Sequence, residues 1–262
     1  MNGLVPTAAA AARAVHVERC MGTVFTIDVR DPGHWDDAIA EVVAWLHRVD
    51  AIFSTYRESS DISRIRAGRL RVAQAAPEFG DVLDLCARAA LDTGGAFTAM
   101  PDAKLDPTGL VKGWAIEQAS QLLRQRGSHN HAVNGGGDMQ LAGGAAPDRP
   151  WSVGIADPGD RERIVSVVVA RDLAVATSGV AERGLHILDP FTGRRATGVA
   201  SATVVGPSLA LADAYATAAV VLGPDAVRWL DGLPRYEGLL VTSDNQQLTS
   251  VGWTRHTTGP NP

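Results

Sequence analysis

The stretch VVGPSLALADAYATAAVVLG, residues 204–223, constrains the fold more than any other part of the chain. Its alanines and leucines favour a helix, and a helix this apolar has to be packed inside a protein. Asp213 and Thr217 lie within it, four residues apart and therefore on one helix face, with Ala216 nearly on that face. Since an unpaired buried carboxylate is unstable, Asp213 needs either a partner or an exposed position.

Two interpretations of this pair remain open. A carboxylate, a hydroxyl and a nearby carbonyl are hard oxygen donors of the kind that Mg²⁺ prefers. Alternatively, Asp213 lies on an exposed polar stripe, and Thr217 donates to the carbonyl four residues earlier. The spacing alone favours the second interpretation.

The pattern around this helix predicts an α+β fold. Apolar spacing indicates helices at 36–53, 77–92 and about 108–126, with Thr108 capping and Gly127 ending the third, and a short helix near 224–231. A strand is expected over 15–30 with Gly22 as a bend, several strands over 130–206, one of them at 185–190, and two more within 236–253. Because helices come early and strands late, the order is not the regular alternation of an α/β protein. We expect one domain over 15–255, with frayed ends at 1–14 and 256–262.

Charge and composition exclude several classes of protein. The formal net charge of −5 gives no basic footprint for nucleic acid. No apolar stretch reaches the length of a membrane span, and the amino-terminal residues lack the pattern of a secretory signal. Two cysteines, Cys20 and Cys86, form no disulfide framework, and His129 and His131 have no third ligand for zinc. We therefore expect a cytoplasmic protein without a nucleic-acid or membrane partner.

Three further motifs are ambiguous when taken singly. In DPTGLVKGWAIE (106–117), Lys112 falls in the first turn of a helix, where either Asp106 or a bound phosphate would offset its charge. NGGGD (134–138) is not a dinucleotide-binding fingerprint and is read as a tight hairpin. A Thr-Ser-Gly turn precedes His186 and Asp189, but there is no nucleophile elbow or obvious triad.

The order of the motifs along the chain resembles the ApbE family of FAD:protein FMN transferases, some members of which hydrolyse FAD. The resemblance runs from about residue 17 to about residue 250. It implies an α+β fold related to the tunnelling fold, with FAD in a cleft between two intimately packed subdomains. The matching segments are MGT (21–23), STYR (54–57), GGAF (94–97), DPTGLVKGWAIE (106–117), NGGGD (134–138), ATSGVAERGLHILDPFTG (176–193) and ADAYATA (212–218).

The same resemblance implies a set of site residues. The Mg²⁺ ligands would be the side chains of Asp213 and Thr217 with the carbonyls of Ala216 and Gly109. His186 would act in the transfer step, and Asp189 is either an alternative base or the residue that orients His186. The positions matching FAD contacts are Met21, Tyr56, Ala96, Phe97, Thr98, Asp106, Lys112 and Ile187 or Leu188. Thr98 departs from the family, which often has Asp there.

The function implied is Mg²⁺-dependent transfer of FMN from FAD to a Ser or Thr hydroxyl of an acceptor protein, with release of AMP. An FAD pyrophosphatase and a non-catalytic FAD-binding protein are the alternatives. The sequence does not separate transfer from hydrolysis, and it identifies neither the acceptor nor the oligomeric state.

Overall fold

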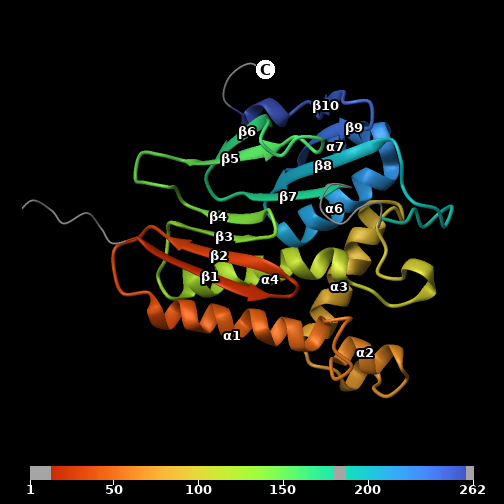
Figure 1. Ribbon diagram of the computed structural model, residues 1–262, viewed down its shortest axis with the longest axis horizontal. Helices are drawn as coiled ribbons and strands as arrows, with labels where there is room; N and C mark the ends of the chain where they lie inside the picture. Colours follow the sequence, from red (N-terminus) through yellow and green to blue (C-terminus); the bar gives the residue numbers. More distant parts are fainter. Residues whose placement is uncertain (1–12, 180–186, 258–262) are drawn as a thin grey trace, which may run out of the picture.

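A computed structural model describes residues 13–179 and 187–257 (Figure 1). In these residues one antiparallel sheet of eight strands extends through the molecule. This confirms the α+β expectation. In spatial order the strands are β1 (Ala14–Cys20), β2 (Thr23–Val29), β3 (His131–Gly135), β4 (Asp138–Ala142), β7 (Ala174–Gly179), β8 (Val199–Gly206), β9 (Glu237–Thr242) and β10 (Gln247–Thr249).

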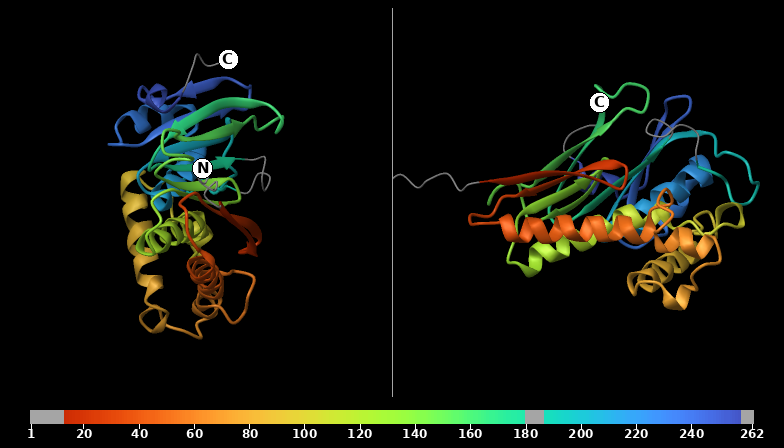
Figure 2. Two further views of the ribbon diagram at one scale, coloured as in Figure 1. Left: turned by 90° about the vertical axis from the view of Figure 1, so that its left-hand side faces the viewer. Right: turned by 60° about the horizontal axis from the view of Figure 1, so that its bottom comes forward.

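Helices cover one face of the sheet, as the right-hand view of Figure 2 shows. α1 (Asp36–Phe53) and α4 (Thr108–Gln125) pack beneath β1 to β4, and α6 (Leu209–Leu222) packs beneath β7 and β8. α3 (Glu78–Asp92) contacts α4 and α6, whereas the short α2 (Asp61–Arg66) packs against α1, and α7 (Ala226–Asp231) packs against β9. The larger hydrophobic core lies between these helices and the sheet.

The other face is partly covered by a separate hairpin of β5 (Trp151–Ala156) and β6 (Ile164–Ala170). Alternate β5 residues are buried, so the hairpin turns one apolar face to the sheet. A second hydrophobic core forms there from the hairpin, strands β4 and β7 to β9, and Trp253. The sheet is therefore buried on both faces around β7 and β8.

The helix at the centre of the sequence argument is α6, and it is buried as expected. Its alanines let α4 approach so closely that a Cβ on Gly113 would lie 2.5 Å from the Leu209 carbonyl oxygen. Asp213 is only 4% exposed, and Thr217 is half-buried. The interpretation of Asp213 as an exposed residue is therefore wrong.

Several local expectations were wrong. Residues 15–30 form a hairpin, because Met21 and Gly22 take positive φ angles of 52° and 71° between β1 and β2. Thr108 does not cap α4; instead Asp106 Oδ1 accepts hydrogen bonds from the Thr108 N–H and hydroxyl, at 3.1 and 2.6 Å. Within the described residues, the strand expected around 185–190 is reduced to a bridge between Leu188 and Arg195.

Ordered structure also extends beyond the expected domain ends. Arg13 forms an ion pair with Asp28 at 2.8 Å, and Ala14 begins β1. Near the carboxyl end, His256 belongs to a short 3₁₀ helix, and Thr257 bridges to Val168 on β6. Residues 13–14 and 256–257, which were expected to be frayed, therefore belong to the ordered fold.

One helical stretch in the described residues, Leu209–Asp231, is long and apolar enough to cross a membrane by length and composition. The sequence pattern did not indicate an apolar stretch of this length, because it predicts α6 and α7 as two separate helices. Burial accounts for its apolar character, since 61% of the apolar window is buried inside the molecule.

Candidate functional site

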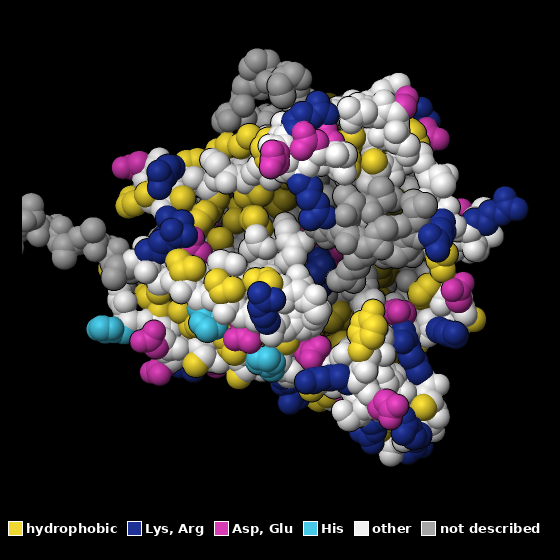
Figure 3. All heavy atoms as spheres, viewed as in Figure 1, with side chains coloured by type: hydrophobic (Ala, Val, Ile, Leu, Met, Phe, Trp, Pro, Cys, Tyr) yellow, Lys and Arg dark blue, Asp and Glu magenta, His cyan; other side chains and the backbone are white. Residues whose placement is uncertain are grey.

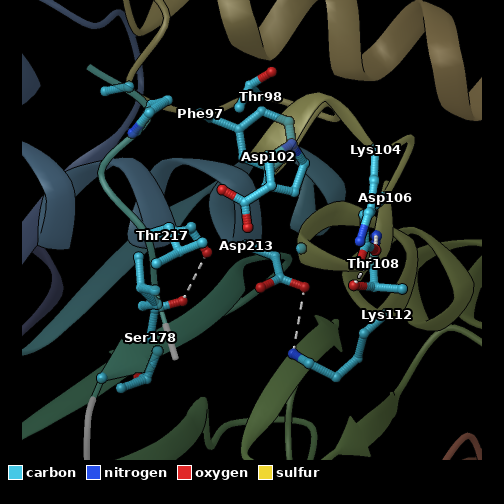
Figure 4. A pocket seen from close by; sticks show the side chains of 18 of the residues that line it. Phe97, Thr98, Asp102, Lys104, Asp106, Thr108, Lys112, Ser178, Asp213 and Thr217 are labelled. Atoms are coloured by element: carbon cyan, nitrogen blue, oxygen red, sulfur yellow. Dashed lines mark hydrogen bonds and ion pairs between the residues drawn. The ribbon is translucent and has the colours of Figure 1, made fainter. Parts of the chain in front are cut away.

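A pocket of about 430 Å³ opens where α4, α6, the end of β7 and the connection between α3 and α4 meet (Figure 4). These segments are far apart in the sequence. The pocket brings together nine of the expected site residues: Ala96, Phe97, Thr98, Asp106, Gly109, Lys112, Ile187, Asp213 and Thr217. Leu188, the alternative to Ile187, also lines it.

α6 presents Asp213 and Thr217 to this pocket from one face. The amino-terminal turn of α4 lies directly opposite, because Gly109 has no side chain to hold it away. A Cβ on Gly109 would lie 3.3 Å from the Phe97 ring and 4.0 Å from Thr217 Oγ1. The glycine therefore keeps the α4 backbone next to the pair of candidate metal ligands.

The Asp213 carboxylate is held by the neighbouring helix. Its Oδ2 accepts a hydrogen bond from the Gly113 N–H at 3.1 Å and lies 3.3 Å from Lys112 Nζ. Lys112 is 20% exposed and also forms an ion pair with Asp138. The Lys112 ammonium group therefore lies between two buried carboxylates, Asp138 and Asp213.

Asp138 lies next to the site, at the point where backbone pairing between β4 and β7 stops. The pairing of β4 with β7 ends at Met139 and Val175. One residue further on, Asp138 Oδ1 accepts the Thr177 N–H at 2.9 Å in place of a backbone carbonyl. The NGGGD segment forms the expected tight hairpin between β3 and β4, and positive φ angles at Gly136 and Gly137 make the turn.

The residues at this point fit a magnesium ion. Thr217 Oγ1 and Ser178 Oγ lie 3.1 Å apart, so two hydroxyls accompany the Asp213 carboxylate. The described residues hold no cluster of three His, Cys, Asp or Glu side chains for a metal. Mg²⁺ does not need one, because it commonly binds one or two carboxylates and completes its shell with phosphate oxygens and water. Ala216 is buried and does not line the pocket, and because its methyl side chain carries no donor atom, only its carbonyl could contribute.

Three cationic side chains also line the pocket. Arg66 and Lys104 line it together with Lys112. Arg66 also fixes Asp106, through a contact of 2.9 Å to its carboxylate and a hydrogen bond of 2.6 Å to the Leu105 carbonyl. At the start of α4, the Thr108 N–H already bonds to Asp106, and the Leu110 and Val111 N–H groups bond to the Pro107 carbonyl. It is therefore the three cationic side chains that allow the pocket to bind an anion.

Sequence reasoning missed five of these residues. Ser178 and Asp138 lie in motifs that were recognised, but no spacing rule joined them to α4 or α6. Arg66, Asp102 and Lys104 lie outside the matched motifs, so only the assembled fold places them here. Asp102 points its carboxylate into the pocket in Figure 4, from a loop in which it and Ala103 have φ angles of 52° and 56°. Such left-handed angles are strained for residues other than glycine.

Other predicted site residues lie elsewhere. Tyr56 is 97% exposed and Met21 lies in the β1–β2 turn; neither lines the pocket. Asp189 Oδ1 accepts from the Phe191 N–H and its Oδ2 from the Thr192 hydroxyl, both at 2.8 Å. These bonds, the Thr192 hydroxyl foremost, lower the Asp189 pKa, which makes this carboxylate a weak base at neutral pH. His186 lies outside the described residues.

A second hollow adjoins the pocket. Figure 3 shows it between the β5–β6 hairpin and the β3–β4 pair, with apolar side chains on its floor. It has a volume of about 230 Å³, and Met139, Val153 and Ile155 are among its lining residues. Thr177 and Gly179 line both cavities, so the end of β7 forms their common border.

Comparison with known proteins identifies relatives with a shared description. FAD:protein FMN transferase of Escherichia coli (strain K12) is 32% identical over 152 residues, which is 54% of this chain and 42% of that protein. The protein of the same description from Rhodobacter capsulatus is 31% identical over 206 residues, which is 75% of this chain and 36% of that protein. The chain thus spans less than half the length of these curated relatives.

Solved structures show the same fold. The ApbE protein from Thermotoga maritima matches with a TM-score of 0.85 at 22% identity, covering 95% of this chain and all of that one. Flavin transferase ApbE from Vibrio cholerae matches with a TM-score of 0.81 at 22% identity, covering 94% and 99%. The model of the ApbE family matches residues 21–100 and 98–240, which together include every expected pocket residue. On this match the chain belongs to the ApbE family.

Proposed function

We propose that this protein is an Mg²⁺-dependent FAD:protein FMN transferase, which moves FMN from FAD to a Ser or Thr hydroxyl of an acceptor protein and releases AMP. One observation carries the proposal. A single pocket joins an oxygen-donor pair on α6, Asp213 and Thr217, to three cationic side chains, Lys112, Arg66 and Lys104. This combination suits a pyrophosphate together with its counter-ion.

Asp213 and Thr217 would hold the magnesium ion, with Ser178 and the carbonyls of Gly109 and Ala216 as further oxygen donors. When bound, the ion would supply positive charge that stabilises the negative charge developing on the pyrophosphate oxygens. Lys112 would bind phosphate oxygens directly, with Arg66 and Lys104 as the further cations that line the pocket. Asp213 and Lys112 are preorganised, because α4 and α6 pack tightly at Gly113.

Apolar walls complete the pocket. Phe97 is buried and Ile187 and Leu188 are half-buried, and all three line the cavity that also holds the charged groups. They provide surfaces for a flat aromatic ring of the substrate and exclude water from around the phosphates. The lining thus offers separate places for the ring and the charged parts of a dinucleotide.

Transfer also requires that the acceptor hydroxyl lose its proton. We propose His186 as the general base, because the reference pKa of an imidazole, about 6.5, lies close to neutral pH. Asp189 is the weaker alternative, since two hydrogen bonds already stabilise its charged form. The proton then leaves with the released AMP.

We further propose a reducing, cytoplasmic location, which is supported by two buried free thiols, Cys20 and Cys86. Burial raises their pKa values to about 11 and about 12, so neither is a reactive thiolate. The proposed partners are FAD and an acceptor protein, without nucleic acid or membrane. Fractionation of cells that produce the full protein would test the location.

One incubation tests the function. The protein, FAD and Mg²⁺ are mixed with purified candidate acceptor proteins, and AMP release is followed with the intact mass of each acceptor. Transfer predicts AMP together with an acceptor heavier by one FMN, less water. AMP and free FMN without a modified acceptor would instead establish an FAD pyrophosphatase. FAD binding without AMP would establish a non-catalytic binding protein. Asp213→Asn is the control for the site.

A further inference from the structure

Asp138 is the most deeply buried charged residue at the pocket, and the family resemblance assigns it no role. It is 1% exposed, its Oδ1 accepts the Thr177 N–H at 2.9 Å, and its other oxygen faces the Lys112 ammonium group. The same ammonium group lies 3.3 Å from Asp213 Oδ2. One lysine is therefore shared between two carboxylates, one of which is the predicted metal ligand.

Sharing creates a competition at Asp213. A divalent cation and the Lys112 ammonium group would both occupy the space beside the same carboxylate, and like charges at such short separation repel each other. The cation binds well only if the lysine has another negative partner to hold it. The lysine should pair preferentially with Asp138. Without a cation beside it, the more deeply buried Asp138 carboxylate would be much less stable than the Asp213 carboxylate, which borders the open pocket.

We propose that Asp138 is a positioning residue: it retains the Lys112 ammonium group and thereby leaves the Asp213 carboxylate available to a divalent cation. The inference rests on the proposed function only in placing a cation at Asp213, and not on flavin transfer. It gives Lys112 two positions, one shared with Asp213 when the cation is absent and one on Asp138 alone when the cation is bound.

The proposal predicts opposite effects for the two members of the pair. Lys112→Met removes the competitor, so the affinity for a divalent cation should rise about tenfold. Asp138→Asn keeps an oxygen to accept the Thr177 N–H but removes the charge that retains the lysine. The lysine then pairs with Asp213 alone, and the affinity should fall at least fivefold.

The decisive test is a double-mutant cycle on metal binding without nucleotide. Mn²⁺ is titrated into wild type, K112M, D138N and the double variant, and free Mn²⁺ is measured by electron paramagnetic resonance. If Asp138 acts through Lys112, D138N should change affinity less than twofold once residue 112 is Met. Asp138 could instead attract the cation by its own negative charge or stabilise the fold. In that case D138N should weaken Mn²⁺ binding equally with Lys or with Met at position 112, which would overturn the proposal.

Asp172→Asn is a matched control. Asp172 also accepts one backbone N–H, from Gly143 at 3.0 Å, and pairs with one cation, Arg124 at 2.6 Å, but neither of these partners lines the pocket, whereas Lys112 does. It should leave Mn²⁺ affinity unchanged. If D138N does not fold, K112M alone still tests the proposal. Unchanged or weaker Mn²⁺ binding by K112M would show that Lys112 does not compete with the cation for Asp213. Absence of Mn²⁺ binding by wild type also refutes it, whereas a lack of AMP release would contradict only the proposed function.

Discussion

Gly113 is where a single methyl group should separate the two helices that build the pocket. A Cβ at this position would lie 2.5 Å from the Leu209 carbonyl oxygen and 2.9 Å from Asp213 Cβ. Both separations are far below a normal contact, and the first is to backbone, which cannot rotate away. Gly113→Ala must therefore push α6 away from α4 or distort one of the helices.

The expected loss of stability follows from two opposing terms. Overpacking in a close-packed core costs about 1–3 kcal/mol, and a clash with backbone belongs at the upper end of that range. Replacing glycine by alanine inside a helix contributes about 1 kcal/mol of stabilisation. We therefore expect Gly113→Ala to lower the free energy of unfolding by about 2 kcal/mol, measured by urea denaturation.

Gly80 provides the matched control. It also lies in a helix, α3, with no positive φ, but a Cβ there meets nothing within 4 Å. Gly80→Ala should raise the free energy of unfolding by about 0.5–1 kcal/mol, because only the propensity gain remains. Because the helices separate beside Asp213, Gly113→Ala should also weaken Mn²⁺ and FAD binding, whereas Gly80→Ala should not. Equal stabilities for the two variants would refute the argument from close packing.

Four further outcomes are expected. Asp213→Asn should reduce AMP release by roughly 10²-fold or more while keeping the wild-type circular dichroism spectrum, and EDTA should reproduce the loss in wild type; normal turnover would make α6 purely structural. His186→Ala should slow FMN transfer roughly 10²–10⁴-fold with little change in FAD affinity, and wild-type transfer would move the base to Asp189. Burial lowers the pKa of His131 to about 4, so between pH 6.5 and 4 the unfolded state binds a proton at this residue and the folded state does not. The free energy of unfolding should therefore fall by roughly 3 kcal/mol as pH drops from 6.5 to 4. Urea denaturation of His131→Gln should show a weaker dependence of stability on pH, and an unchanged dependence would contradict the reasoning. Ala103→Gly should raise the unfolding free energy by about 1 kcal/mol by relieving its positive φ of 56°, and no gain would show that the loop is unstrained.

The sequence determined the features that depend on local pattern. The apolar spacing of 36–53 is that of α1, and the alanine-rich run 204–223 contains the buried α6 with Asp213 and Thr217 on one face. The glycines of NGGGD supply the positive φ angles of a tight hairpin turn. The resemblance to the ApbE family named nine residues that meet in one pocket, and they come from the segment after α3, from α4, from the segment after β7 and from the middle of α6.

Only the tertiary structure decided which of these groups interact. Spacing alone favoured an exposed Asp213, but packing of α4 against α6 at Gly113 buries it beside Lys112. Asp138 joins them because the pairing of β4 with β7 ends at Met139 and Val175, and Arg66 reaches Asp106 only through the placement of α2. Tyr56 shows the converse, since it lies in a matched motif yet is exposed away from the pocket. Periodicity records which face of an element is buried, whereas the partner of a buried charge depends on strand register and helix separation, which are set by the packing of the whole core.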